Sequence, residues 1–387
     1  MEFLKQALND MKRSNSYRQL IPLASAQEPT VVVDGKNYIM LASSNYLGLS
    51  NHPKLIQAAQ DAAEQFGFGS GGSRLITGNT TLHEKLEFAI AKYLGTEAAI
   101  LFNSGYDANI GAISALMTGD TVIFSDELNH ASIIDGCQLA RAKTVIYKHN
   151  NMQDLEKKLK KIGTGKKRYS KKFIITDTIF SMDGDLAALQ ELTELAAHYD
   201  AFVMVDEAHA VGVFGDSGGG VVEFLGVEDK IDIRMGALSK AFGTTGGYIA
   251  GSNELIDYLR NRARSFIYTT SLPAPVLASG LAAIEIVRLE PELRAKLWAN
   301  IEYFKKALDD YGFNTMSSSS QIIPILIGSI EDTMAFSRYL FETGIFVTGI
   351  RPPTVPPGKC RIRTTMMANH SKSDLESVVK IFRKYNI

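Results

Sequence analysis

Two stretches of the chain carry residue types that could do chemistry together. In the first, Met235–Tyr248, Lys240 is surrounded by glycines and other small residues, and apolar, strand-like segments flank it. A lysine with so little steric hindrance can reach into a cleft, where burial would lower the affinity of its amine for a proton and make it a usable nucleophile. Taken alone, this stretch favours a surface lysine in a flexible loop, because most lysines are exposed.

The second stretch, Ala201–His209, reverses that preference. A hydrophobic segment runs directly into Asp206, and His209 follows three residues later. Pyridoxal phosphate is held as a Schiff base by a lysine amine, and its ring withdraws electrons only while the pyridine nitrogen is protonated. A carboxylate against that nitrogen keeps the proton in place, and a histidine beside the ring hydroxyl can tune the ring by a hydrogen bond. Lys240, Asp206 and His209 therefore predict a pyridoxal phosphate site.

Composition limits the class of protein that could carry such a site. The chain has 387 residues, a formal net charge of -1 and 45% hydrophobic residues, which is enough for a large core and two domains. The balanced charge gives no reason to expect nucleic acid or an anionic membrane as a partner. Cys137 and Cys360, far apart in sequence, suggest a reducing compartment and inert, buried thiols. Since we find neither a signal peptide nor a membrane span, we expect a soluble, cytoplasmic protein.

From Ala98 the sequence alternates between apolar strand candidates and helical stretches. The expected strands are Ala98–Phe102, Thr121–Phe124, Thr144–Tyr147, Phe173–Thr176, Phe202–Val205, Ile231–Ala237 and Gly247–Ala250. This pattern predicts an α/β fold with a mostly parallel, seven-stranded sheet covered by helices on both faces. In such sheets ligands bind at the carboxyl ends of the strands. Ser104, His130, Ser181 and Asp206 each follow or end one of these strands.

The two ends of the chain read differently from its middle. We expect a helix from Met1 to about Arg18 and a hairpin over Val31–Leu41, followed by a loop in which Asn45 offers hydrogen bonds. Beyond about Pro273 long helices dominate, and a proline-rich loop that starts at Arg351 leads into a strand containing Arg363. We therefore predict three parts: an N-terminal segment (1–45), a large cofactor-binding domain (46–275) and a smaller C-terminal α/β domain (276–387).

Each weaker motif has a structural alternative. The glycine cluster Gly67–Arg74 could bind an anion ahead of a helix or could be a flexible linker. Ser104–Asn109 could cradle a phosphate with free N–H groups at a helix start, or be an ordinary turn. His130 could stack on a ring or be structural, and Ser181 could contact the ring hydroxyl or only form a turn. Arg363 could capture a carboxylate with both guanidinium N–H groups or form a surface salt bridge.

Taken together, six motifs resemble the α-oxoamine synthase family of pyridoxal phosphate enzymes of fold type I. They are SGYDAN, NHAS, FSMDGD, VDEAH, LSKAFG and the C-terminal RIR, and their order and spacing are specific as a set. The resemblance runs from Ser43 to His370, nearly the whole chain. It implies an acyltransferase that assembles as a homodimer with shared active sites, and its pattern contains no metal ligands.

The resemblance also implies a role for individual residues. Around the cofactor ring, Lys240 would form the Schiff base, Asp206 would meet the pyridine nitrogen, His209 and Ser181 would lie near the ring oxygen, and His130 would stack on the ring. Around the phosphate, the backbone at Gly105 and Tyr106 would supply N–H groups. The other subunit would donate Thr270, which follows a segment that we expect to be a strand, Arg264–Tyr268. Arg363 would bind the substrate carboxylate. Asn45, Arg18 and Arg351 are further candidates for substrate binding, the two arginines at the far end of the acyl group.

One position departs from the family pattern. Many members have a phosphate-binding threonine three residues before the lysine, where this chain has Ala237, and Ser239 replaces a common glycine. We expect Ser239 or Thr270 to supply the missing hydroxyl.

The segment Ile350–Pro356 and the FSMDGD motif most resemble the branch of the family that works in biotin biosynthesis. This implies a decarboxylative condensation of L-alanine with a pimeloyl thioester of CoA or a carrier protein. The alternative within the family joins glycine to acetyl-CoA. The acyl chain, its carrier and the amino acid are not fixed by the sequence.

Two other classes of protein stay open at this point. Parallel α/β sheets also host NAD, but the cluster Gly67–Gly72 spells no GxGxxG after a strong strand. A protein of this fold that has lost activity and serves as a regulatory partner would lack the lysine, and Lys240 is present.

Overall fold

The computed structural model describes residues 1–165 and 168–385. By their contacts these residues divide into two compact units. The large unit comprises Leu49–Ser181 and Leu186–Arg294. The small unit comprises Met1–Gly48, Met182–Asp185 and the described residues from Ala295 onward. The predicted domain boundaries at 45/46 and 275/276 stay a prediction.

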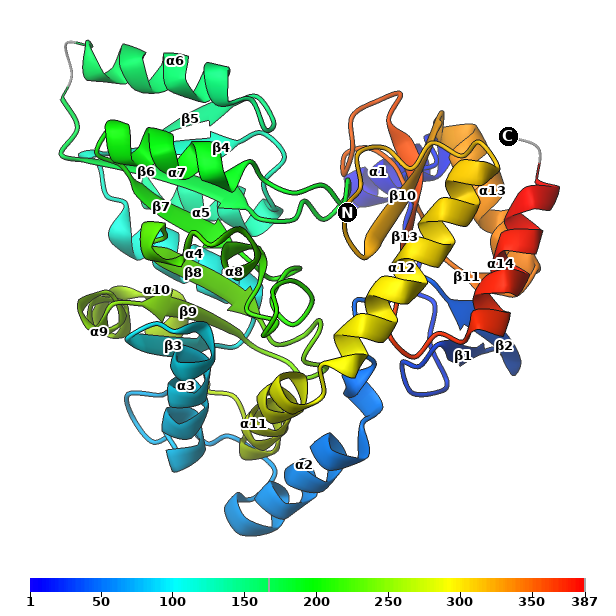
Figure 1. The fold of residues 1–387 in the computed structure, drawn as a ribbon, viewed down its shortest axis with the longest axis horizontal. Helices are drawn as coiled ribbons and strands as arrows, with labels where there is room; N and C mark the ends of the chain where they lie inside the picture. Colours follow the sequence, from blue (N-terminus) through cyan, green and yellow to red (C-terminus); the bar gives the residue numbers. More distant parts are fainter. Residues whose placement is uncertain (166–167, 386–387) are drawn as a thin grey trace. The chain divides into compact units, whose positions relative to one another are not determined.

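The large unit is built on a seven-stranded sheet (Figure 1). In spatial order its strands are β3 (Ala98–Phe102), β9 (Gly247–Gly251), β8 (Ile233–Ala237), β7 (Phe202–Asp206), β6 (Lys171–Asp177), β4 (Thr121–Asp126) and β5 (Lys143–Tyr147). All neighbouring pairs are parallel except the two that involve β9, which runs antiparallel to β3 and β8. The predicted fold class, a mostly parallel seven-stranded sheet with helices, is confirmed.

Helices in the large unit bury the apolar strands that the sequence shows as continuous runs. They are α2 (Pro53–Phe66), α3 (Thr81–Leu94), α4 (Gly105–Leu116), α5 (Ala131–Ala140), α6 (Met152–Gly163), α7 (Leu189–His198), α8 (Val221–Leu225), α9 (Asn253–Arg262), α10 (Arg264–Ile267) and α11 (Ala274–Leu289). Residues of α4 and α5 such as Ala112 and Ile133 share one core with strand residues such as Ile123 and Met204. Sequence reasoning expected a strand over Arg264–Tyr268, and this was wrong. The segment forms the short helix α10, because Phe266 packs into that core against Phe102.

The small unit contains two three-stranded sheets. The first joins β1 (Thr30–Val33), β2 (Lys36–Met40) and β11 (Ile345–Phe346), and it confirms the predicted hairpin with its turn at Asp34 and Gly35. The second joins β10 (Ile322–Gly328), β13 (Cys360–Thr365) and β12 (Thr348–Ile350). The accompanying helices are α1 (Glu2–Arg13), most of α12 (Glu292–Asp310), α13 (Ile330–Glu342) and α14 (Lys372–Lys384). The first helix ends earlier than the expected Arg18, because Asn15 adopts a positive φ of 52° just beyond it.

Both cysteines are free and buried, as expected, and burial raises the pKa of the Cys137 thiol to about 11. Among residues 1–165 and 168–385, no helix is both long and apolar enough to cross a membrane.

Candidate active site

The candidate site lies at the carboxyl-end edge of the large unit's sheet. Asp177 is the last residue of β6 and Asp206 the last of β7, and the two are paired in register. Strand β8 ends at Ala237, and Lys240 follows three residues later. Parallel strands thus bring together three groups that are up to 63 positions apart in sequence. This is the edge at which α/β sheets bind ligands.

Asp206 is buried, and both of its carboxylate oxygens accept a hydrogen bond. Asn109 Nδ2, on α4, donates to Oδ2 at 2.7 Å, and the backbone N–H of Ala208 donates to Oδ1 at 2.8 Å. Two donors from different elements therefore fix the orientation of the carboxylate. A carboxylate held as an acceptor at a strand end has the charge that a protonated pyridine nitrogen requires.

Lys240 lies in the turn that joins β8 to β9. The turn is closed by hydrogen bonds from Leu238 N–H to Gly246 O at 2.9 Å and from Thr244 N–H to Leu238 O at 3.1 Å. Gly243 has a φ of +64°, and a Cβ there would lie 2.4 Å from the backbone nitrogen of Ser50, so this position requires glycine. Lys240 is partly buried, whereas the neighbouring Ser239 is exposed. The charge of Lys240 helps to lower the pKa of His130 and opposes the rise in the pKa of Asp177, which places the amine near both residues.

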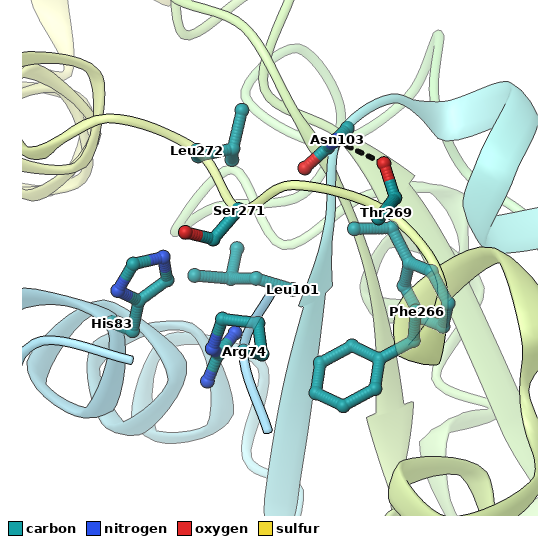
Figure 2. A pocket seen from close by; sticks show the side chains of 9 residues that line it. Arg74, His83, Leu101, Asn103, Phe266, Thr269, Ser271 and Leu272 are labelled. Carbon is teal, nitrogen blue, oxygen red and sulfur yellow. Dashed lines mark hydrogen bonds between the residues drawn. The ribbon is translucent and has the colours of Figure 1, made fainter. Parts of the chain in front are cut away.

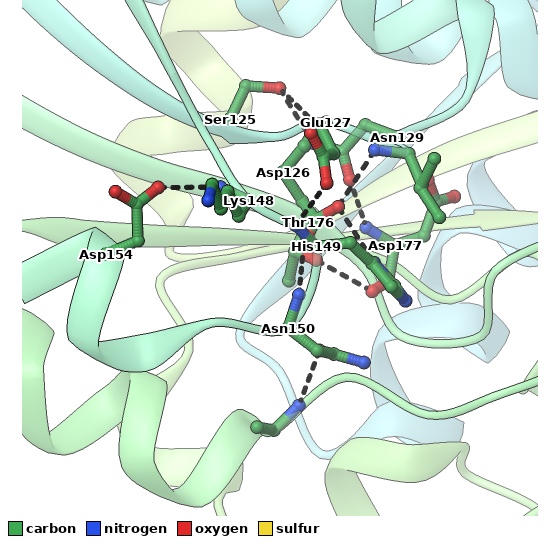
Figure 3. A network of polar contacts seen from close by, with 12 residues as sticks. Ser125, Asp126, Glu127, Asn129, Lys148, His149, Asn150, Asp154, Thr176 and Asp177 are labelled. Atoms are coloured by element: carbon green, nitrogen blue, oxygen red, sulfur yellow. Dashed lines mark hydrogen bonds and ion pairs between the residues drawn. The ribbon is translucent and has the colours of Figure 1, made fainter. Parts of the chain in front are cut away.

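His130 is the N-cap residue of α5, and its backbone N–H donates to Asp177 Oδ2 at 2.7 Å. Asp177 is held in turn by Asn129, whose Oδ1 accepts from the Asp177 N–H at 3.0 Å (Figure 3). Burial, and after it the neighbouring charge of Asp206, raises the pKa of the Asp177 carboxyl well above its usual range. His130 is exposed as a residue, which leaves room for its ring to contact a ligand.

His209 and Ser181 also belong to this edge of the sheet. His209 lies three residues after Asp206 and is buried. Ser181 lies four residues after the end of β6 and is half-buried.

The predicted phosphate cradle falls at the start of α4. Ser104 caps the helix by accepting from the Asp107 N–H at 3.1 Å, and Gly105 and Tyr106 are its first two residues. The first N–H groups of a helix have no partner inside it and suit an anion. A Cβ on Gly247 of β9 would lie 2.5 Å from Ser104 O, so glycine is needed there for β9 to approach this turn closely. Pyridoxal phosphate requires a lysine amine, a carboxylate for its ring nitrogen and N–H groups for its phosphate. The residues present offer all three, so they fit this cofactor.

Thr270 lies beside Asn103, the residue that directly precedes the helix cap Ser104, in a segment that is closely held. Asn103 Nδ2 donates to Thr269 Oγ1 at 3.0 Å and to Thr270 O at 2.7 Å, and Thr270 forms an antiparallel bridge with Ser73. The side chain of Thr270 is exposed. The bridge ties the glycine cluster Gly67–Arg74 to this segment through backbone contacts.

Beside this segment lies the hollow drawn in Figure 2, with His83, Asn103, Thr269 and Ser271 among its lining residues. Its volume is about 10 Å³, room for a single water at most. Burial lowers the pKa of His83 to about 3, so this ring is neutral. A cavity of this size cannot hold a cofactor or substrate.

The other candidate residues belong to the small unit. Arg351 Nη2 donates to Tyr17 O at 2.9 Å, and the adjacent Arg18 donates to Thr354 Oγ1 at 3.0 Å. Burial and the nearby charge of Arg18 lower the pKa of Arg351, so the two predicted arginines lie close to each other. Asn45 is buried, and its Nδ2 donates to Gln27 O at 3.0 Å.

The two arginines of β13 have different surroundings. Arg363 is half-buried and is paired in register with Pro324 and Thr348. Arg361, two positions earlier, is buried and forms an ion pair with Asp183 at 2.8 Å, a structural role.

Sequence reasoning missed three residues that organise the site: Asn109, Ser132 and Asp177. Asn109 and Ser132 stand inside the motifs SGYDAN and NHAS, but their partners are on other elements, so the motifs alone give no role. Asp177 ends a strand as Asp206 does, and that position was the available signal. Sequence reasoning also gave no role to Glu207, which forms a buried ion pair with Arg234 at 2.6 Å.

Comparisons with known proteins agree with this geometry. The profile of the aminotransferase class I and II family matches residues 36–382. The chain is 48% identical over 384 residues to an 8-amino-7-oxononanoate synthase of Thermoanaerobacter pseudethanolicus, covering 99% of this chain and 96% of that protein. It is 50% identical over 386 residues to the enzyme of the same name from Citrifermentans bemidjiense, covering 99% of this chain and 98% of that protein.

Two solved structures extend the comparison. A serine palmitoyltransferase of S. paucimobilis, with bound PLP and myriocin, is similar with a TM-score of 0.93 and 33% identity over 98% of this chain and 96% of that one. The structure of an 8-amino-7-oxononanoate synthase from Francisella tularensis is similar with a TM-score of 0.77 and 30% sequence identity. The match covers 90% of this chain and 97% of that one.

Proposed function

The chain belongs to the aminotransferase class I and II family and its cofactor is pyridoxal phosphate, and on this premise we propose that it is an 8-amino-7-oxononanoate synthase. The reaction joins L-alanine to a pimeloyl thioester. The α-carbon of alanine bonds to the thioester carbonyl carbon, and the thiol leaves. The alanine carboxylate then departs as CO2, and a proton returns to the α-carbon. The observation that supports the reaction type best is the set Lys240, Asp206 and His130 at one sheet edge.

The proposed site residues divide the chemical work. When bound, the cofactor supplies an electron sink for the charge that develops at the α-carbon. Lys240 would hold the cofactor, and its amine would remove the α-proton as a general base. Asp206, held by Asn109 and Ala208, would keep the proton on the ring nitrogen. His130 would lie against the ring and donate to the acyl carbonyl oxygen as negative charge builds there. Arg363, in the small unit, would pair with the alanine carboxylate.

The pair Arg18 and Arg351 supports the choice of a pimeloyl group. A pimeloyl thioester ends in a carboxylate, whereas acetyl and palmitoyl thioesters do not. The two cations lie close enough for the charge of Arg18 to lower the pKa of Arg351, and neither forms an ion pair with any acid in the described parts of the chain. Two neighbouring unneutralised arginines favour binding of a carboxylate. The prolines around Arg351 restrict φ and hold the loop in shape before the substrate binds.

A matrix of substrates tests this function. Purified protein is assayed for thiol release with alanine, glycine or serine against pimeloyl-, acetyl- and palmitoyl-CoA and a pimeloyl carrier protein. We expect the highest kcat/KM for L-alanine with a pimeloyl thioester. A preference for glycine with acetyl-CoA would assign the protein to another branch of the same family.

A homodimer with shared sites is part of the proposal. The segments that the Ser73–Thr270 bridge joins carry large exposed side chains, among them Phe68 (81% exposed), Ile76 (79%) and Tyr268 (71%). An apolar surface of this kind is suited to a second copy of the chain. The partner subunit's Thr270 would then supply the phosphate contact that Ala237 cannot.

Hybrid dimers test the sharing. Lys240→Ala and Thr270→Ala, each inactive alone, are mixed after reversible dissociation. If each site takes its lysine from one chain and its threonine from the other, every hybrid has one intact site, so about a quarter of the wild-type activity returns at random mixing. Mixtures that stay inactive although hybrids form would show that each site is complete within one chain.

A further inference from the structure

A series of hydrogen bonds through Ser132 and Asn109 connects His130 to the carboxylate of Asp206, and the donor of each bond can be identified. His130 Nδ1 lies 3.3 Å from the backbone nitrogen of Ser132 and 2.7 Å from its Oγ. A backbone N–H can only donate, so Nδ1 must be the acceptor and cannot carry a proton. The Ser132 hydroxyl therefore also donates to Nδ1.

Asn109 fixes the other end of this chain of bonds. Its Nδ2 donates to Ser132 Oγ at 2.9 Å and to Asp206 Oδ2 at 2.7 Å, and its side chain is fully buried. Turning the amide over would place a carbonyl oxygen against the Asp206 carboxylate, so the orientation is settled by the network. Ser132 Oγ thus accepts from Asn109, which leaves its own proton directed to His130.

The rest of the histidine is held as well. The His130 backbone N–H donates to Asp177 Oδ2 at 2.7 Å, and Asp177 is paired in register with Asp206. Desolvation lowers the pKa of His130 and the charge of Lys240 lowers it further, whereas Asp206 and Asp135 act in the opposite direction. The net lowering keeps the ring neutral. A neutral ring with Nδ1 as acceptor carries its one proton on Nε2.

We propose that Ser132, oriented by Asn109, is a positioning residue that selects the Nε2–H tautomer of His130. Without the hydroxyl, only the longer backbone contact at 3.3 Å would favour this tautomer. Some molecules would then carry the ring proton on Nδ1 instead of Nε2. In those molecules Nε2 could no longer donate a hydrogen bond. The inference rests on the proposed function only for the use of that donor; the tautomer itself is a property of the protein before any substrate binds.

Nitrogen NMR of the holoenzyme labelled with 15N-histidine tests the proposal, because the two tautomers have distinct ring-nitrogen shifts. The chain has seven histidines, and His130→Gln identifies the signal of interest. We expect wild type to show His130 with the proton on Nε2. In Ser132→Ala the signal should shift toward a mixture with Nδ1–H, and Ser132→Thr, which keeps the hydroxyl, should restore it. Ser279→Ala, a buried serine of α11 whose hydroxyl donates to Pro275 O, is the matched control and should change nothing.

Ser132→Cys serves if the alanine variant does not fold, since a thiol of similar size is a weak donor and should give a partial shift. A pure Nε2–H tautomer in Ser132→Ala or Ser132→Cys would overturn the proposal. As a second measurement, kcat of condensation in Ser132→Ala should fall about five- to tenfold with little change in KM for alanine, the size of one hydrogen bond. If the tautomer shifts while the enzyme uses other substrates, the positioning role stands and the proposed substrates are wrong.

Discussion

The carboxyl-end edge of the large unit's sheet and the arginine pair of the small unit hold their charged groups in contrasting ways. At the sheet edge, Asp206 is buried and receives two hydrogen bonds from separate elements. In the small unit, Arg18 is exposed and Arg351 half-buried. Arg18 donates to the loop residue Thr354, and Arg351 donates to Tyr17 O, to Gly349 O of β12 and to the sulfur of Met334 on α13.

The contrast indicates which part of the function each region can vary. A carboxylate fixed by a buried network has one orientation, so the ring chemistry tolerates little change around it. Arginines on loops can move or be replaced with small cost to the fold, because exposed groups contribute little to stability. We therefore expect substitutions at the sheet edge to abolish chemistry, and substitutions of the arginine pair to alter the choice of acyl group.

The largest effect should come from Lys240→Ala. The variant should fold, because a turn lysine adds little to the core, but it should release no thiol and exchange no α-proton of alanine. Thiol release and deuterium exchange measured by NMR provide the two readouts. Lys230→Ala, an exposed lysine of the same unit, is the control and should keep full activity. Substantial turnover in a clean preparation of Lys240→Ala would remove this residue from the chemistry.

Glu207→Gln tests whether this buried carboxylate, next to Asp206 in sequence, stabilises the fold rather than taking part in the chemistry. Glu207 pairs with Arg234 at 2.6 Å and accepts from the Val222 N–H at 3.0 Å, so its loss leaves a buried guanidinium without its counter-charge. The free energy of unfolding should fall by about 3–5 kcal/mol, measured by urea titration at fixed protein concentration. Glu254→Gln, an exposed acid on α9, should change it by less than about 0.5 kcal/mol. Equal stability of both variants would show that the pair is not structural.

Asp206→Asn should act on chemistry instead of stability. The side chain keeps its shape and loses its charge, so the protein should still bind pyridoxal phosphate. Exchange of the alanine α-proton should slow by about 10²–10³, the usual result of removing one preorganised electrostatic group. This exchange needs no acyl thioester, so it isolates the first step. An unchanged exchange rate would separate Asp206 from the mechanism.

The smallest effect belongs to the arginine pair. Charge-assisted contacts contribute about 1.5–3 kcal/mol, so Arg351→Ala or Arg18→Ala should reduce the preference for pimeloyl over acetyl and palmitoyl thioesters by about one to two orders of magnitude. The measurement is kcat/KM for the three thioesters in each variant. Alanine α-proton exchange should stay at the wild-type rate in both, which is the internal control. If neither variant changes the preference, another group recognises the acyl end.

Local sequence patterns were sufficient to predict the elements whose conformation depends on residues close together in the chain. The apolar runs with turns between them predicted all seven strands of the sheet, with ends that differ from the structure by at most two residues. The Asp34–Gly35 turn predicted the hairpin β1–β2. The segment Arg264–Tyr268 failed for the opposite reason. Its composition allows a strand, but packing of Phe266 against Phe102, far away in sequence, favours a helix.

By itself, the sequence determined the chemical parts of this protein: a lysine in a glycine-rich turn, an acid at a strand end and a helix start that can hold a phosphate. Those choices follow from local backbone rules, which act within a few residues. Only the tertiary structure decided that Asp206 and its neighbour Glu207 have different roles. Asp206 is held by Asn109 at the candidate site, whereas Glu207 forms a structural ion pair with Arg234. The reason is that successive residues at a strand end point in different directions, and what each one meets is supplied by elements distant in the chain.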